Sequence, residues 1–326
     1  MMPRQASTYL GLFIFLMIAI IVPAHLGGQW VKIFTSASCF AIAAAGVSML
    51  YARLNMVSLA QVGLMGVGGW VMLRMNHGLQ LPFEANLLVA VLVTTFFGVV
   101  LALPALRMRG LYLALVTLMA ASGLEVIFST FRFPNGGPGF WGVIPSVAAP
   151  FRRPYLASSD EAYLTYCMVV GLVAFLTLAW VRRSAPGRAW ALIQRSEAAA
   201  MASGVDVTRN KSLAFALSGA LAGLAGGLLS GSLGMLDPGT FQASESIMLF
   251  ALCVVGGSRY WLGAVLAAGL YRVLPALFND WGLDAKLALV VFGAALLHAI
   301  VTSETGMAGQ IHGLIARLSG GKVDRA

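Results

Sequence analysis

Charged side chains are scarce in this chain. Asp, Glu, Lys and Arg together make up 10% of its 326 residues, whereas 59% of the residues are hydrophobic. Ordinary soluble domains carry about a quarter charged residues, so this composition leaves too little polar surface to cover a water-soluble fold. The scarcity of charge therefore predicts a protein embedded in the lipid bilayer.

The sequence also lacks the residue patterns that bind nucleotides or metals. Its one Gly-Lys pair, Gly321-Lys322, has neither the upstream glycine nor the following Ser or Thr of a Walker A loop. The four histidines are scattered, the three cysteines lie in apolar runs, and no paired acids suit magnesium. We therefore expect no catalytic residues, no metal site and no cofactor in this chain. An integral membrane enzyme is a disfavoured alternative.

Apolar stretches long enough to cross a bilayer recur along the sequence. A helix needs about 20 mostly apolar residues to cross ~30 Å of hydrocarbon. One stretch is short and another is interrupted by glycines, so we expect an all-α integral membrane protein. It would be a single domain, residues 1–326, with about eight to ten transmembrane helices. The stretches are 9–26, 33–51, 57–75, 85–104, 110–130, 161–181, 212–232, 244–257, 261–278 and 285–302.

The first of these stretches has two possible interpretations. A single base followed by an apolar run is also the pattern of a signal peptide. The run is longer than the hydrophobic part of most signal peptides, and no small-x-small cleavage site follows it. We therefore favour a first transmembrane helix that is retained.

The basic residues between the stretches orient the chain in the membrane. The net charge of +9 is not clustered on a soluble domain, so it does not predict nucleic-acid binding. If both termini are cytoplasmic, fourteen bases lie inside and six outside, which follows the positive-inside rule. Loop 182–211 is then cytoplasmic and loop 131–160 is external. The inside bases are Arg4, Arg53, Arg107, Arg109, Arg182, Arg183, Arg188, Arg195, Arg209, Lys211, Arg259, Arg317, Lys322 and Arg325.

The cytoplasmic loop contains the segment GRAWALIQRSEAAAMASG, residues 187–204. Its residues favour a single helix that Gly204 would end. Helical spacing places Trp190, Ile193, Glu197 and Met201 along one side of that helix. The alanines around Glu197 would let another surface approach closely, so we interpret the segment as a docking helix. A solvated connector is the plainer alternative.

Glycines form two further patterns. Gly219, Gly223, Gly227 and Gly231 recur every four residues, which predicts a groove along one helix face for close helix packing. Around residues 55–69 the glycines are less regular, which predicts a broken third span. Such a break must be buried in protein or line a cavity. A substrate path there is one hypothesis and tight packing is the other; its residues are Asn55, Ser58, Gln61, Gly66 and Gly68.

Residues 197–226, EAAAMASGVDVTRNKSLAFALSGALAGLAG, resemble the permease subunits of ABC importers for branched-chain amino acids. Further segments of this chain are similar to that family. They are RLNMVSLAQVGLMGVGGW (53–70), RGLYLALVT (109–117), NGGPG (135–139) and VVGGSRYWLGAVLAA (254–268). By position, the Glu-Ala-Ala motif that seats in the ATPase subunit of these importers matches Glu197, Ala199, Ala200 and Gly204. The resemblance thus implies that this segment is a coupling helix.

The resemblance also implies partners and a location. ABC ATPase subunits would bind ATP, a second homologous permease would complete the core, and a periplasmic or extracellular solute-binding protein would deliver the solute. The protein would lie in the bacterial inner membrane. Where the family usually has Gly-His after Ser-Leu, this chain has Ala60 and Gln61, so the solute could differ from a branched-chain amino acid. Relatives include permeases for urea and short amides. The alternative to an importer subunit is a stand-alone secondary transporter or channel.

Overall fold

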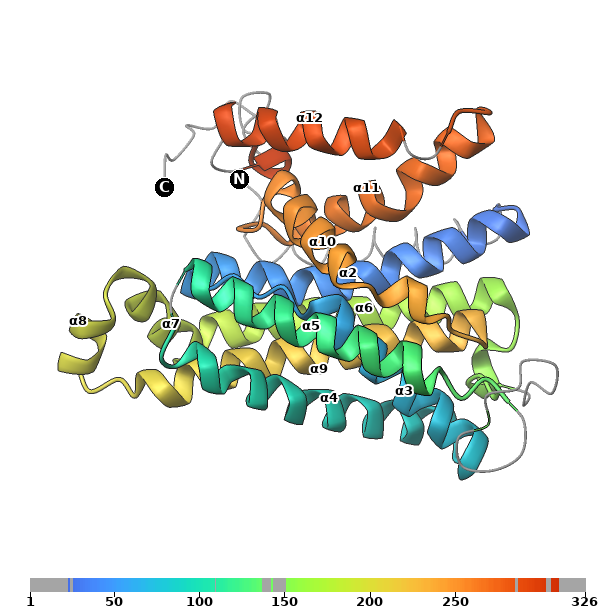
Figure 1. Ribbon diagram of the computed structural model, residues 1–326, viewed down its shortest axis with the longest axis horizontal. Helices are drawn as coiled ribbons and strands as arrows, with labels where there is room; N and C mark the ends of the chain where they lie inside the picture. Colours follow the sequence, from blue (N-terminus) through green and yellow to red (C-terminus); the bar gives the residue numbers. More distant parts are fainter. Residues whose placement is uncertain are drawn as a thin grey trace, which may run out of the picture.

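The computed structural model describes residues 26–108, 110–136, 151–284, 287–302 and 306–310, together with residues 23 and 142. In this part of the chain the secondary structure is helical, apart from a lone bridge at Gly136. Figure 1 shows the long helices lying side by side, with α7 and α8 at one end of the bundle. The helices are α2 (Gly28–Leu54), α3 (Gln61–Gly78), α4 (Phe83–Ala105), α5 (Leu111–Phe131), α6 (Asp160–Arg183), α7 (Ala185–Arg195), α8 (Glu197–Ala202), α9 (Val207–Leu233), α10 (Ala243–Gly256), α11 (Trp261–Asp280) and α12 (Leu287–Thr302).

The predicted all-α membrane fold is confirmed. Within the described residues, six helices are long and apolar enough to cross a membrane: α2, α4, α5, α6, α9 and α11. The helices α3, α10 and α12 are shorter or less apolar, and each coincides with a predicted stretch. The predicted first span, residues 9–26, lies almost wholly outside the described part, as do most of the Gly-rich segment 135–139 and the C-terminal residues beyond 310.

Helix α9 lies at the centre of the bundle and packs along α4 (Figure 1). All four glycines of the predicted stripe face neighbouring helices. A Cβ atom added at Gly219 would lie 2.5 Å from the carbonyl oxygen of Thr94, and one at Gly227 would lie 2.6 Å from Leu87 Cδ1. At Gly223 it would overlap the Thr94 hydroxyl, and at Gly231 the hydroxyl of Tyr163 on α6. The missing side chains thus allow the backbone of α9 to approach α4.

The same helix approaches α3 with a second set of glycines. A Cβ atom at Gly68 would lie 2.7 Å from the Cα atom of Gly223, and one at Gly226 would overlap the carbonyl oxygen of Met65. On a third side, α9 packs against α2. Because lipid offers no hydrophobic drive for helix association, such backbone contacts supply much of the packing energy in membranes.

The predicted break in the third span lies elsewhere than expected. Residues 61–78 form one uninterrupted helix that contains the glycines, and the irregular segment is 55–60. Asn55, with a positive φ of 54°, ends α2. The Thr117 hydroxyl accepts a hydrogen bond from the Leu59 amide, and the Ser246 hydroxyl accepts one from the Val62 amide. These hydroxyls from α5 and α10 satisfy backbone groups that lipid could not.

Replacing Gly223 by Ala should destabilise the bundle. The added methyl group overlaps Thr94 and lies 2.9 Å from the Ala90 carbonyl oxygen, so α4 and α9 must separate. Overpacking of this kind costs about 1–3 kcal/mol of unfolding free energy. Gly123→Ala on α5 is the matched control, because its added methyl group meets no other atom within 4 Å. Unfolding of both variants in detergent micelles would test this, and equal stabilities would contradict it.

Candidate coupling site

The segment after α6 folds as two short helices, so the prediction of a single helix over 187–204 was wrong. Helix α7 ends at Arg195, and Ser196 is extended with φ −162° and ψ 120°. Its hydroxyl accepts a hydrogen bond from the Ala199 amide at 3.3 Å and begins α8. Ser is a strong helix N-cap, and this local hydrogen bond competes with continuing α7 through the position.

Helix α7 is fixed to three membrane helices. An added Cβ atom at Gly187 would lie 2.5 Å from the Val181 carbonyl oxygen, so only glycine allows this tight turn after α6. The buried Trp190 donates from Nε1 to the Asn210 carbonyl of α9, at 3.1 Å. Gln194 donates to the Ala52 carbonyl near the end of α2, at 3.0 Å. A displacement of α7 must therefore move the ends of α2, α6 and α9 or break these contacts.

Glu197 forms an ion pair with Lys211 near the start of α9, at 2.8 Å between Oε1 and Nζ. The Lys211 side chain is only 3% exposed and that of Glu197 is 22% exposed. A buried ammonium group is costly unless it is paired, so the pair fixes α8 against α9. Both residues are prominent in the sequence, but no local pattern predicts that they pair. Only the folding of the loop brings them together.

The predicted shared face of Trp190, Ile193, Glu197 and Met201 was also wrong. Trp190 and Ile193 are buried under α7, whereas Met201 is 58% exposed on α8. The break at Ser196 changes the direction of the chain, and helical spacing counted across it has no meaning.

Helices α7 and α8 lie at one end of the bundle (Figure 1). Apolar side chains of both helices are exposed. We call this surface the apolar tip. Exposed apolar groups at this end of the bundle are typical of a protein-interaction surface. Of the predicted coupling residues, Ala199 belongs to the tip and Ala200 is buried beneath it. The tip comprises Leu192, Ala198, Ala199, Met201 and Ala202.

Gly204 ends this surface. Its φ of +79° is a left-handed conformation that costs L-residues free energy and that glycine adopts readily. The Val205 amide donates to the Ala200 carbonyl at 3.0 Å and the Gly204 amide to that of Met201, which closes the end of α8. Gly204 thus shapes the chain behind the tip.

The predicted substrate-path residues lie in packing contacts. Gln61 donates to the carbonyls of Ala43 and Ser218, at 3.1 and 3.2 Å, and accepts from the Ser218 hydroxyl at 2.9 Å. It thereby joins α2, α3 and α9. A Cβ atom at Gly66 would lie 2.9 Å from Phe128 Cζ.

The remaining substrate-path residues do not gather at a cavity either. Gly68 lies against Gly223, the side chain of Ser58 is buried, and Asn55 is exposed at the end of α2. None of the five residues lines either described cavity.

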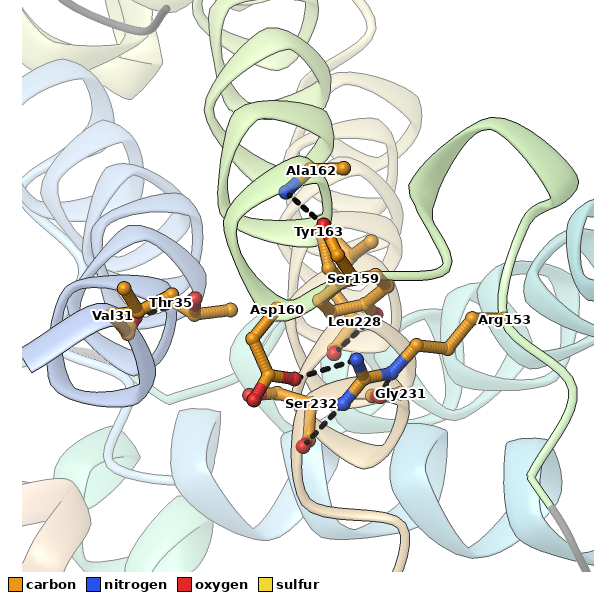
Figure 2. Close-up of polar contacts among 10 residues, drawn as sticks. All are labelled: Val31, Thr35, Arg153, Ser159, Asp160, Ala162, Tyr163, Leu228, Gly231 and Ser232. Atoms are coloured by element: carbon orange, nitrogen blue, oxygen red, sulfur yellow. Dashed lines mark hydrogen bonds and ion pairs between the residues drawn. The ribbon is translucent and has the colours of Figure 1, made fainter. Parts of the chain in front are cut away.

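At the opposite end of α9, Arg153 forms a clamp that sequence analysis did not predict (Figure 2). Its guanidinium donates to Asp160 at 2.6 Å and to the carbonyls of Gly231 and Ser232 at 2.9 and 3.2 Å. Tyr163 adds a hydrogen bond to the Leu228 carbonyl at 2.7 Å. A cation at a helix C-terminus satisfies its last carbonyls and complements the helix dipole. In the sequence, the adjacent bases Arg152 and Arg153 were the feature that could have indicated this clamp.

Comparison with known proteins gives a consistent result. A family model described as the permease component of branched-chain amino acid transport systems matches residues 29–300. The LivM permease protein of a high-affinity branched-chain amino acid transport system, from Salmonella typhimurium, is 27% identical over 90% of this chain and 73% of its own length. The LivH permease protein of the same organism is 24% identical over 85% and 93%. The fructose import permease protein FruG of Bifidobacterium longum is 24% identical over 94% and 93%. No solved structure shows a significant match.

Glu197→Ala should destabilise the protein by about 3 kcal/mol, because it leaves the buried Lys211 ammonium without its carboxylate. The double exchange Glu197→Lys, Lys211→Glu should recover part of this loss. Glu161→Ala, which removes an exposed carboxylate from the first turn of α6, should cost less than ~1 kcal/mol. Unfolding in micelles would measure all three, and a Glu197→Ala variant as stable as Glu161→Ala would contradict the role of the pair.

Gln61→Leu should lower the unfolding free energy by about 2 kcal/mol, because it removes three helix-joining hydrogen bonds and leaves the Ser218 hydroxyl without Oε1. We expect solute affinity in an uptake assay to remain unchanged. A weakened affinity with unchanged stability would instead place Gln61 on the solute path.

Proposed function

Because this chain belongs to the family of permease components of branched-chain amino acid transport systems, we propose that it is the membrane subunit of an importer driven by a separate ATPase. The observation that carries the proposal is the apolar tip on α7 and α8. It is exposed on its outer side, and it is joined on its inner side to α9 through Glu197 and Lys211. A surface with these two properties can bind a partner and transmit the partner's movement to α9.

In this proposal, the ATPase subunit binds the apolar tip in a groove of its own. Alanine and methionine side chains suit such a contact, because small residues allow close approach and Met201 adapts to an apolar pocket. ATP is bound by the partner. Its binding and hydrolysis move α7 and α8, and the contacts of Trp190 and Gln194 transmit that movement to α9 and α2. The membrane cavity then switches between outward and inward access.

The tip must face the cytoplasm for this mechanism. Basic residues at the α7 end of the bundle outnumber those at the opposite end within the described residues, which supports this orientation. At the α7 end they are Arg53, Arg107, Arg182, Arg183, Arg188, Arg195, Arg209, Lys211 and Arg259. At the opposite end they are Lys32, Arg74, Arg132, Arg152 and Arg153.

A second permease and a solute-binding protein complete the proposed importer. This chain is similar to both LivM and LivH, two permease proteins that carry the name of the same transport system in one organism. That pairing supports a heterodimeric membrane core. The external end, with the Arg153 clamp, is where a solute-binding protein would deliver its solute.

A branched-chain amino acid is the solute that the family favours. The match to FruG supports the wider possibility of a related small polar solute. The departure at Ala60 and Gln61 from the usual Gly-His supports the same possibility. Leucine is therefore the first solute to test, with fructose and urea as comparisons.

Proteoliposomes that contain this chain, its second permease and the ATPase should take up leucine only when ATP is supplied with the solute-binding protein. Met201→Lys places a charge in the apolar tip and should lower uptake at least tenfold by weakening ATPase binding, while the fold remains intact. Met108→Lys is the control, because it is the same exchange at a side chain that is 38% exposed at the same end of the bundle but outside the tip. Uptake by this chain alone would favour a secondary transporter or channel, and equal uptake by the two variants would disprove the role of the tip.

A further inference from the structure

A large apolar groove lies between α2, α6 and α11, and its lining extends to Ala52, which α7 contacts through Gln194. Its volume is about 750 Å³. Small side chains form its floor, including Ala41 and Ala45 of α2 and Ala264 of α11. Gly171 and Phe175 of α6 form the opposite wall. The proposed coupling mechanism uses none of these residues.

Three arginines surround the end of this groove nearest α7. Arg53 comes from the last turn of α2, Arg182 from the last turn of α6, and Arg259 from the turn before α11. Arg53 lies within electrostatic range of both Arg259 and Arg182. Three like charges thus line one mouth, and an anion bound among them would relieve their repulsion.

No acid of the described residues neutralises this cluster. Among the described residues, the carboxylates near this end of the bundle are Glu197 and Asp206. Glu197 is paired with Lys211, and Asp206 caps the first turn of α9 by accepting from the Arg209 amide. The described residues form two carboxylate ion pairs, and neither includes Arg53, Arg182 or Arg259. Within the described residues, no ion pair balances the positive charge at this mouth.

Aromatic residues place this mouth at the membrane surface. Tyr260 and Trp261 line the groove beside Arg259, and Trp261 is 62% exposed. Such residues are enriched where the hydrocarbon meets the headgroups. The arginines are then at headgroup depth, and the apolar part of the groove extends into the hydrocarbon.

We propose that this groove binds an anionic phospholipid of the leaflet on the α7 side. The phosphate contacts Arg53, Arg182 and Arg259, and one acyl chain lies along Ala45 and Phe175. Guanidinium groups bind phosphate through paired hydrogen bonds, and basic pockets between transmembrane helices bind anionic headgroups. Because α2 and α6 also hold α7, the lipid braces the helices to which the coupling site is attached. The site itself does not depend on the identity of the transported solute.

Native mass spectrometry of the purified chain in detergent tests the site directly. Phosphatidylglycerol and phosphatidylcholine with the same acyl chains are added to the wild type and to the double variant Arg53→Gln, Arg182→Gln. We expect the wild type to prefer phosphatidylglycerol, and the double variant to lose about tenfold or more of that affinity. Arg209→Gln is the matched control, an exposed base at the same end but outside the groove.

Binding of two further ligands distinguishes a lipid site from a site for any anion. Inorganic phosphate and a six-carbon-chain phosphatidylglycerol carry the charge without a long acyl chain, and both should bind much more weakly than the long-chain lipid. Circular dichroism and gel filtration establish that the variants are folded. The proposal is overturned if the wild type shows no preference for phosphatidylglycerol. It is also overturned if the double variant binds phosphatidylglycerol as well as Arg209→Gln does.

Discussion

The close approach of α9 to α3 and α4 is the constraint on which the other contacts depend. Gly223 lies against Thr94 on one side and Gly68 on the other, so three backbones meet at one level. At that spacing Gln61 can reach carbonyl groups of both α2 and α9. Larger residues at these positions would separate the helices by more than a hydrogen bond can span. The hydrogen bonds between helices therefore depend on the close packing that the glycines allow.

The two ends of α9 are held by ionic contacts of different kinds. At the α7 end, Lys211 is buried and has its charge balanced by Glu197 from another helix. At the far end, Arg153 contacts both Asp160 and the terminal carbonyls of α9. The helix has 27 residues and is about 40 Å long, so it spans the bilayer as one continuous element. A displacement of α8 therefore has a stiff path to the far end of α9.

Periodicity predicted the helices well, because runs of apolar residues in lipid have few other ways to satisfy their backbone. The glycine stripe of α9 was visible for a similar reason, since a spacing of four residues is a property of one helix. The break at Ser196 was missed because its neighbours all favour helix, and one side-chain hydrogen bond decided the outcome. The Glu197–Lys211 pair and the Arg153 clamp join separate elements, and no local pattern specifies such partners.

The polar interior of the described helices also bears on where the solute is recognised. Gln61, Ser218 and Ser246 hydrogen-bond to other helices, and Thr117 hydrogen-bonds to Leu59 in the irregular segment 55–60, so their polar groups hold the bundle together. A solute that displaced these bonds would have to replace each one or leave a buried polar group unsatisfied. We therefore expect solute recognition to involve side chains other than these four.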